Sequence, residues 1–225
     1  MAGPLALVGG GEFTDGCTFD DELLAAVGTD EVALLATGWA YENPARAVRA
    51  ATEWFSSRGV RLVEVPVYSR ADGLDADNLA KVRAAKMLYI TGVSAMHLRS
   101  VLKDSPLLDA VLEAWSSGAA LVGAGAGADV LCDPMVDTRG GAFTVGLGVL
   151  PGLAVIPRSD QWSPDKVRRT IDLASPSVTV VELPERTALV LDAGASQWRA
   201  AGAGRVIVHR AGALADLEAV SIPAS

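Results

Sequence analysis

Residues 119 to 128 decide the fold, because an apolar run passes there directly into alternating glycine and alanine. They read Ala119-Ala120-Leu121-Val122-Gly123-Ala124-Gly125-Ala126-Gly127-Ala128. A short apolar run that ends in glycines is typical of a strand buried on both faces of a sheet and followed by a sharp turn. The stretch therefore predicts a buried strand that turns tightly into a helix.

Four similar apolar runs precede this strand, at residues 5–8, 32–35, 62–67 and 87–90, and helical patterns occupy residues 44–58, 106–115 and 163–173. In the first helical pattern, Val48, Ala51 and Phe55 share one face, opposite Arg46 and Arg49. Strand and helix in alternation predict an α/β fold with a doubly wound, mostly parallel sheet and helices on both faces. After residue 176, shorter runs at 178–181, 188–191, 197–199 and 206–208 predict a short antiparallel C-terminal extension of the same sheet.

The composition bounds the class of protein before any motif is considered. The chain has 225 residues, of which 50% are hydrophobic and 20% charged, and its net charge is −8. This predicts one globular domain over residues 1–210, with a C-terminal tail over residues 211–225. The acidic balance argues against a nucleic-acid partner, and no apolar run reaches the length of a membrane span. Without a basic leader or a disulfide framework, we expect a cytoplasmic protein.

A ligand site is expected in the turns after the strands, because ligands in open α/β sheets bind beyond the carboxyl ends of the strands. Residues 9–11 are all glycine and precede Glu12. Such a run either presents backbone N–H groups to an anion or forms only a tight turn. After the fifth strand, Gly123 and Gly127 fit the G-x-S-x-G turn that holds a nucleophile in several hydrolase folds. The central residue here is Gly125, so the pattern of the turn is present without the nucleophile.

Six motifs occur in order along the chain. They are Gly9-Gly10-Gly11-Glu12, Thr91-Gly92, Ser105-Pro106-Leu107-Leu108-Asp109-Ala110, the turn at residues 123–128, Gly146-Leu147-Gly148-Val149-Leu150-Pro151-Gly152 and Glu185-Arg186-Thr187-Ala188-Leu189. Together they resemble the motifs of the cyanophycinase and dipeptidase E family of serine peptidases. A further segment is similar to a sequence pattern of an actinobacterial branch of this family. It reads Cys132-Asp133-Pro134-Met135-Val136-Asp137. The resemblance covers nearly the whole chain and implies a class I glutamine amidotransferase-like fold.

The resemblance also implies a serine nucleophile, a histidine base and an acid that orients the histidine. The nucleophile position here is Gly125, the base position is Arg158, and the acid position retains Glu185. In the family's T-G-G-[ND]-Q loop, the second glycine is replaced by Val93 and the glutamine by Ala95. We expect Arg158 and Glu185 to form a bidentate ion pair, at about 2.7–2.9 Å, where the family has a proton relay.

The expected ligand-binding residues lie in the turns at this edge of the sheet. They are Gly10, Gly11, Glu12, Trp39, Tyr41, Glu42, Ser94, Met96, Ala126, Asp129, Asp160 and Trp162. Aromatic walls with a few charged groups are typical of a ligand pocket. The alternative is that Trp39 and Trp162 only fill the space that an inactive site leaves vacant.

The histidines and cysteines do not fill the missing positions. The two histidines are His97, which we expect to begin a helix, and His209, which we expect to be solvated at the end of a strand. Cys132 is expected in the core, two turns into the helix after the glycine turn. Cys17 is expected to be a free thiol, with a redox or nucleophilic role as the alternative.

Two functions remain open from the sequence. The first is a catalytically degenerate homologue of these serine peptidases, which binds a small peptide, an amino-acid-like ligand or a protein partner without hydrolysis. The second is a rewired enzyme, acting in specialised metabolism, in which Asp129, Glu185, Asp160 or Cys17 carries acid–base or thiol chemistry on an amino-acid or peptide substrate. We expect no metal, no cofactor and no membrane partner, and a homodimer as the assembled state.

Overall fold

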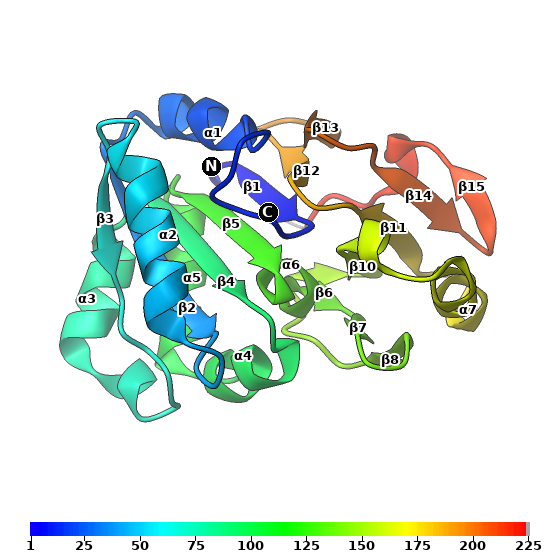
Figure 1. The fold of residues 1–225 in the computed structure, drawn as a ribbon, viewed down its shortest axis with the longest axis horizontal. Coiled ribbons are helices and arrows are strands. Elements are labelled where there is room, and N and C mark those ends of the chain that lie inside the picture. The colour runs from blue at the N-terminus through cyan, green and yellow to red at the C-terminus, as the bar shows by residue number, and fades with distance from the viewer. Residues whose placement is uncertain (224–225) are drawn as a thin grey trace.

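Over residues 1–223, which the computed structural model describes, a seven-stranded sheet lies beside a four-stranded one (Figure 1). The strand order of the larger, first sheet is β13-β12-β1-β5-β4-β2-β3. Its strands are β1 (Leu5–Val8), β2 (Glu31–Gly38), β3 (Arg61–Glu64), β4 (Met87–Gly92), β5 (Ala120–Gly125), β12 (Thr187–Leu191) and β13 (Arg199–Gly202). The strands β1 to β5 are parallel to one another, whereas β12 and β13 are antiparallel additions at one side. This confirms the mostly parallel sheet that the sequence predicts.

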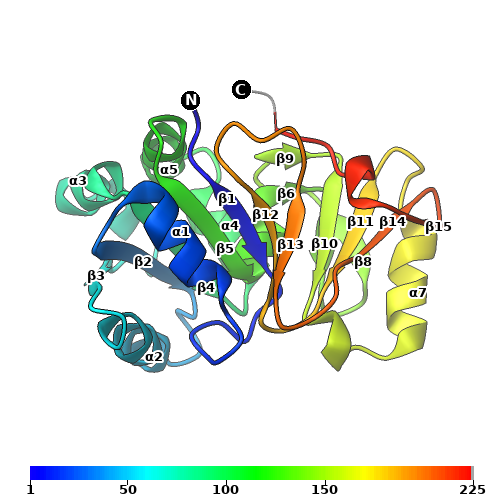
Figure 2. The ribbon, with the colours of Figure 1, turned by 90° about the horizontal axis from the view of Figure 1, so that it is seen from above.

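Helices cover both faces of the first sheet, as Figure 2 shows from above. One face carries α1 (Phe19–Val27) and α2 (Pro44–Ser56), and the other carries α3 (Ala76–Ala84), α4 (Ala95–Leu102) and α5 (Pro106–Ser116). Successive residues of a strand point to opposite faces. Accordingly, Leu5 and Leu7 pack on the side of α3 to α5, whereas Ala6 and Val8 pack on the side of α1 and α2. The doubly wound arrangement is therefore confirmed.

The start of α2 is fixed by its sequence. The side chain of Asn43 accepts a hydrogen bond from the backbone N–H of Arg46 at 3.3 Å, and a proline occupies the first turn, where no N–H is needed. Near the other end of the helix, Phe55 is fully buried and meets Phe13 and Tyr89 edge-on. The C-terminal half of α2 is thus held in the core, and the first turn of α2 lies just past the carboxyl end of β2.

The second sheet has the strand order β10-β11-β14-β15. Its elements are β10 (Leu153–Pro157), α7 (Pro164–Leu173), β11 (Thr179–Leu183), β14 (Ile207–Arg210) and β15 (Ala213–Ala215). The strands β10 and β11 are parallel, whereas β14 and β15 are antiparallel. The expectation that residues 178–181 and 206–208 extend the first sheet is wrong, because β11 pairs with β10, a strand that the sequence pattern does not predict. Residues 213–215 also belong to this sheet, although their small side chains predict a free tail.

Residues 126–152 connect the two sheets. The short helix α6 (Ala126–Leu131) follows β5 directly, and two strand pairs come next. They are β6 (Cys132–Asp133) with β9 (Leu150–Pro151), and β7 (Met135–Asp137) with β8 (Ala142–Thr144). Because α6 ends at Leu131, Cys132 lies in a strand and not in the helix where we expect it, although it is buried in the core as predicted.

One apolar core runs through both sheets. It includes Leu7 and Leu121 from the first sheet and Val155 and Val181 from the second. The two sheets therefore stabilise one another by shared burial of apolar surface. Among the helices of residues 1–223, none combines the length and the apolar character that crossing a membrane requires.

Candidate functional site

The turn between β5 and α6 has the shape of a turn that presents a nucleophile. Gly125 has φ 57° and ψ −116°, a combination that a residue with a side chain holds only under strain. It pairs with Gly92 at the carboxyl end of the neighbouring strand β4. The predicted tight turn is confirmed, and its central residue offers no side chain.

Close packing explains the glycines on either side of this turn. A Cβ at Gly123 would lie 2.6 Å from the carbonyl oxygen of Gly127, and a Cβ at Gly127 would lie 2.0 Å from that of Ile90. Neither distance is possible in a packed interior without moving the backbone. At Gly125 an added Cβ would lie 2.9 Å from the carbonyl oxygen of Gly92. The turn therefore excludes side chains at its flanks and crowds any side chain at its centre.

The base and acid positions come from two neighbouring parallel strands of the second sheet. Arg158 directly follows β10, and Glu185 lies just past the end of β11. The Nε atom of Arg158 lies 3.2 Å from Oε1 of Glu185. The expected ion pair is present, but the contact through Nε is longer than the predicted bidentate pair. The two side chains remain 43% and 29% exposed, so this pair contributes little to stability.

The backbone aims the guanidinium of Arg158 away from the second sheet. Its φ of 52° and ψ of 40° are left-handed, a conformation that costs a non-glycine residue about 1–3 kcal/mol. Its N–H donates to the carbonyl oxygen of Gly9 at 2.8 Å. The side chain then passes over Gly10, where an added Cβ would lie 2.9 Å from Nε. The missing side chain at Gly10 therefore makes room for Arg158 to reach the first sheet.

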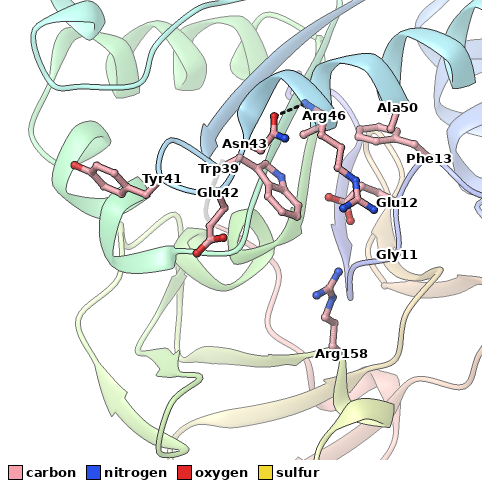
Figure 3. Close-up of a pocket in the computed structure, with 11 residues that line it drawn as sticks. Gly11, Glu12, Phe13, Trp39, Tyr41, Glu42, Asn43, Arg46, Ala50 and Arg158 are labelled. Carbon is pink, nitrogen blue, oxygen red and sulfur yellow. Dashed lines mark hydrogen bonds between the residues drawn. The ribbon is translucent and has the colours of Figure 1, made fainter.

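A cavity of about 600 Å³ opens between the first loop and α2, and we call it the large lobe (Figure 3). Its lining residues are Gly11, Glu12, Phe13, Trp39, Tyr41, Glu42, Asn43, Arg46, Ala47, Ala50 and Arg158. The volume lies in the range of pockets that bind small organic molecules. Figure 3 shows Arg46 and Arg158 reaching into this space from opposite sides, with the Glu12 carboxylate beside Arg46 in that view.

Two smaller hollows continue past the glycine turn. The elbow lobe, of about 160 Å³, is lined by Gly10, Glu12, Trp39, Gly92, Val93, Ala95, Gly125, Ala126, Thr138, Pro157, Arg158 and Trp162. The outer lobe, of about 170 Å³, is lined by Val93, Ser94, Ala95, Met96, Met135, Val136, Asp137, Thr138 and Arg139. Glu12, Trp39 and Arg158 border both the large lobe and the elbow lobe. The nucleophile position thus faces the same cleft as these three side chains.

A directed chain of hydrogen bonds fixes Glu12 at the junction of the two lobes. The indole N–H of Trp39 donates to the hydroxyl of Thr91 at 3.3 Å, and that hydroxyl donates to Oε1 of Glu12. An indole N–H can only donate, so the Thr91 hydroxyl is oriented to donate onward. Glu12 accordingly presents an acceptor carboxylate to the cleft.

Most of the predicted ligand-binding residues come together in this cleft, but Asp129 and Asp160 do not line it. Asp129 is fully buried, and its Oδ1 accepts the N–H of Val136 at 2.7 Å. Its other oxygen has no partner within residues 1–223. Burial raises the pKa of Asp129 well above its ordinary value. Asp160 accepts the backbone N–H of Glu185 at 3.0 Å and so holds the acid-bearing loop.

Three further predicted residues lie at the rim. The Ser94 hydroxyl accepts the N–H of His97 at 3.2 Å and caps α4. Met96 lines the outer lobe and is 48% exposed, and Tyr41 is 82% exposed at the mouth of the large lobe. A ligand in the large lobe would therefore meet Trp39 as its apolar wall more than Tyr41.

Neither the two thiols nor the two imidazoles line any of the three lobes. Cys17 is buried, and burial raises its pKa to about 11. Burial likewise raises the pKa of Cys132 well above its ordinary value. His97 lies in the first turn of α4 as predicted. The expectation of a solvated His209 is wrong, because its Nε2 lies 2.7 Å from Oε1 of Glu182 and its side chain is 12% exposed. Across residues 1–223, no three His, Cys, Asp or Glu side chains gather as a metal site would require.

Sequence reasoning missed Arg46 and Thr138 as cleft residues, and it missed the buried Thr91 as the residue that orients Glu12. Helical periodicity places Arg46 opposite the apolar face of α2, which is correct. It does not show that the first turn of α2 lies beside the ligand edge of the sheet. The signal that could have found Arg46 is its position three residues after the cap Asn43, in a helix that begins just past β2.

The sharp strand-to-helix turn after β5 has the geometry of the nucleophile turn found in several α/β hydrolase folds. The sequence pattern of peptidase family S51 matches residues 5–197, and the chain belongs to this family. A peptidase from an acI-B1 Actinobacterium has 26% identity and a TM-score of 0.82, over 93% of this chain and 91% of its own. A candidate peptidase E protein from Listeria monocytogenes EGD-e shares the fold with 18% identity and a TM-score of 0.63, over 93% of this chain and 99% of its own. No curated protein matches the chain.

Proposed function

We propose that this chain is a catalytically degenerate member of peptidase family S51, which binds a small peptide or amino-acid-like ligand in its cleft without hydrolysing it. The observation that carries the proposal is Gly125, which keeps the backbone shape of a nucleophile turn and has no side chain. The adjoining large lobe stays open, with about 600 Å³. Such a site can hold a ligand but cannot form an acyl-enzyme through this turn.

The base position supports the same function. A general base must accept a proton near neutral pH, and a guanidinium stays protonated in proteins. The carboxylate of Glu185 lies 3.2 Å from Nε of Arg158 and balances its fixed positive charge. A serine hydroxyl in the turn would therefore find no proton acceptor at the base position.

The rewired enzyme is the competing hypothesis, and the groups suggested for it are poorly placed. Cys17 and Asp129 are buried, and burial raises the pKa of each; at about 11, the pKa of Cys17 keeps its thiol protonated at neutral pH. Asp160 is bonded to the backbone of Glu185, and Glu185 is paired with Arg158. None of these four groups is an unengaged acid or base that faces the cleft.

The proposal is tested by labelling with a fluorophosphonate, by assays of hydrolysis and by binding. The substrates are cyanophycin, aspartyl-leucine and alanyl-phenylalanine. We expect no labelling and no release of amino acids, and a thermal shift or calorimetric signal with at least one of the dipeptides. Labelling of the folded protein that disappears on unfolding would contradict the proposal. Hydrolysis without labelling would favour the rewired enzyme, and the absence of any binding would remove the ligand from the proposal.

A further inference from the structure

A second cavity, of about 540 Å³, lies between α7 and the second sheet, and we call it the α7 cavity. Ile171 of α7 packs in one apolar cluster with Ile156 of β10 and Val180 of β11, and the cavity opens where β14 continues the sheet beyond this cluster (Figure 2). Its lining residues are Ser159, Trp162, Pro164, Val167, Arg168, Ile171, Asp172, Glu182, His209, Gly212 and Leu214. Of these, only Trp162 also lines a lobe of the cleft. The α7 cavity is therefore a separate space with its own polar groups.

The polar centre of the α7 cavity is the pair formed by His209 and Glu182. Nε2 of His209 lies 2.7 Å from Oε1 of Glu182, and the two side chains are 12% and 16% exposed. An ionised carboxylate can only accept hydrogen bonds, so Nε2 carries the hydrogen, and Nδ1 of the neutral imidazole is an acceptor. Within residues 1–223, neither Oε2 of Glu182 nor Nδ1 of His209 makes a hydrogen bond. The pair thus leaves acceptor atoms unused in a place of limited solvent access.

The strand register places both groups on the face of the sheet that α7 covers. His209 lies opposite Val180 in the pairing of β11 with β14, so the two side chains share one face. Glu182 is two residues from Val180 along β11 and points to the same face. Leu214 lies opposite His209 in the pairing of β14 with β15, and it is 76% exposed. One surface thus combines a shielded carboxylate with an apolar side chain that is left largely in solvent.

The charges around the α7 cavity favour a cation. Arg168 lines the cavity, but its charge is balanced by an ion pair with Asp165. Asp172, one helical turn further along α7, forms no ion pair within residues 1–223. Lys166 does not line the cavity. Together with the carboxylate of Glu182, negative charge therefore exceeds positive charge around this space while the imidazole is neutral.

From this arrangement we infer that the α7 cavity binds a small organic ammonium ion with an apolar body, of the arylalkylamine class. The ammonium group donates to Oε2 of Glu182, and the apolar body lies along Ile171 and Leu214. An ammonium group has three donors and no acceptor, which suits the unused acceptors of Glu182 and His209. A charge-assisted hydrogen bond gains strength where solvent access is limited. The inference is independent of the proposed function, because it concerns a different cavity.

The test compares three probes by isothermal titration calorimetry. Phenethylamine, phenethyl alcohol and hydrocinnamate share a phenyl ring and two methylene groups, and they end in an ammonium group, a hydroxyl and a carboxylate. We expect phenethylamine to bind most tightly and phenethyl alcohol to bind about tenfold more weakly, because the alcohol loses a charge-assisted contact. Hydrocinnamate should bind more weakly still, since the carboxylate of Glu182 repels it.

Variants assign the binding to the α7 cavity. Glu182→Gln keeps the size of the side chain and removes its charge, so the preference for the amine over the alcohol should be lost. Leu214→Ser removes apolar contact area and should weaken both probes by about threefold. The matched controls are Glu113→Gln, which removes the carboxylate of an ion pair on α5, and Leu173→Ser, which changes an exposed leucine of α7 outside the cavity. Both controls should bind like the unmodified protein.

Each result decides the inference. Equal affinity for the amine and the alcohol overturns it, as does the absence of phenethylamine binding up to about 10 mM. A preference for the amine that is lost in Glu12→Gln and kept in Glu182→Gln also overturns it, because the probe then lies in the cleft. Leu214→Ser changes an exposed side chain and keeps the inference testable if Glu182→Gln does not fold; unchanged affinity in Leu214→Ser overturns it. All of these results leave the proposed function standing.

Discussion

Gly125 adopts a backbone conformation that glycine reaches freely and other residues reach under strain. The carbonyl oxygen of Gly92, 2.9 Å from the place of an added Cβ, crowds the same position. A serine at 125 would meet backbone strain and a close contact together. Its hydroxyl would also lie near a protonated arginine in place of a base. A serine at position 125 alone would therefore lack the histidine base of the serine-peptidase mechanism.

We expect Gly125→Ser to lower the free energy of unfolding by about 1–3 kcal/mol and to remain unlabelled by a fluorophosphonate. The physical reason is that the base position holds a guanidinium, which cannot accept the proton of the hydroxyl. The double variant Gly125→Ser/Arg158→His is the informative partner, because it places an imidazole near Glu185. Labelling of the single variant would show that some other group acts as the base.

At Gly127 the close packing is more severe, because an added Cβ would lie 2.0 Å from the carbonyl oxygen of Ile90. We expect Gly127→Ala to lower the free energy of unfolding by about 3 kcal/mol or more, since backbone atoms must move. Gly140→Ala is the control, because an added Cβ there meets nothing within 4 Å. Urea denaturation of both variants measures the difference, and equal stabilities would contradict the packing argument.

The buried carboxyl of Asp20 should make the stability of the folded protein depend on pH. It is fully buried, and burial raises its pKa from 3.8 to about 7, against the opposing effects of a hydrogen bond from Trp54 at 2.9 Å and the charge of Arg58. Between about pH 4 and 7 the folded state therefore holds a proton that the unfolded state has lost. Stability should fall as pH rises through this window, by at most about 1.4 kcal/mol per pH unit from this group, and should level off above it.

The variant Asp20→Asn imitates the protonated carboxyl and removes this dependence. We expect it to match the unmodified protein near pH 4 and to exceed it in stability at pH 8. Chemical denaturation at a series of pH values gives both curves. Parallel curves for the two proteins across the window would show that Asp20 does not hold the proton.

At the scale of elements, the sequence predicted the five parallel strands well, because strands buried on both faces are continuously apolar. It did not predict which sheet β11 joins, since strand pairing is a contact between distant segments and leaves no local pattern. The residues of the candidate site were likewise predicted only in part. Glu12 and Trp39 lie in turns directly after strands and were found, whereas Arg46 lies one helical turn further on and was missed. The pairing of Arg158 with Glu185 was found through the family resemblance and not through periodicity.

The N-cap of α4 gives a prediction at the scale of elements. It distinguishes a role of Ser94 in capping the helix from a role in binding the ligand. The Ser94 hydroxyl accepts the N–H of His97, and losing such a cap costs about 1 kcal/mol. We expect Ser94→Ala to lose about that much stability and to bind dipeptides with unchanged affinity. Ser100→Ala, an exposed change within the same helix, is the control and should not lose stability. A loss of affinity in Ser94→Ala without a loss of stability would place this hydroxyl on the ligand.

At the scale of the whole molecule, the two sheets share one apolar core. We expect a single cooperative unfolding transition, because neither sheet can leave without exposing the core of the other. Far-ultraviolet circular dichroism and tryptophan fluorescence should therefore follow the same denaturation curve. Two separated transitions would show that the sheets unfold independently.

The glycine at the centre of the turn also has a consequence for how this chain can change over time. A side chain held there would cost about 1–3 kcal/mol, a sizeable part of the 5–15 kcal/mol that typically separates folded from unfolded protein. Gly125 avoids that cost. Since most random substitutions destabilise by amounts of the same size, a chain with this reserve tolerates more of them before it falls below the stability threshold. Mutational tolerance, spread over the whole sequence, is then a property that one missing side chain confers.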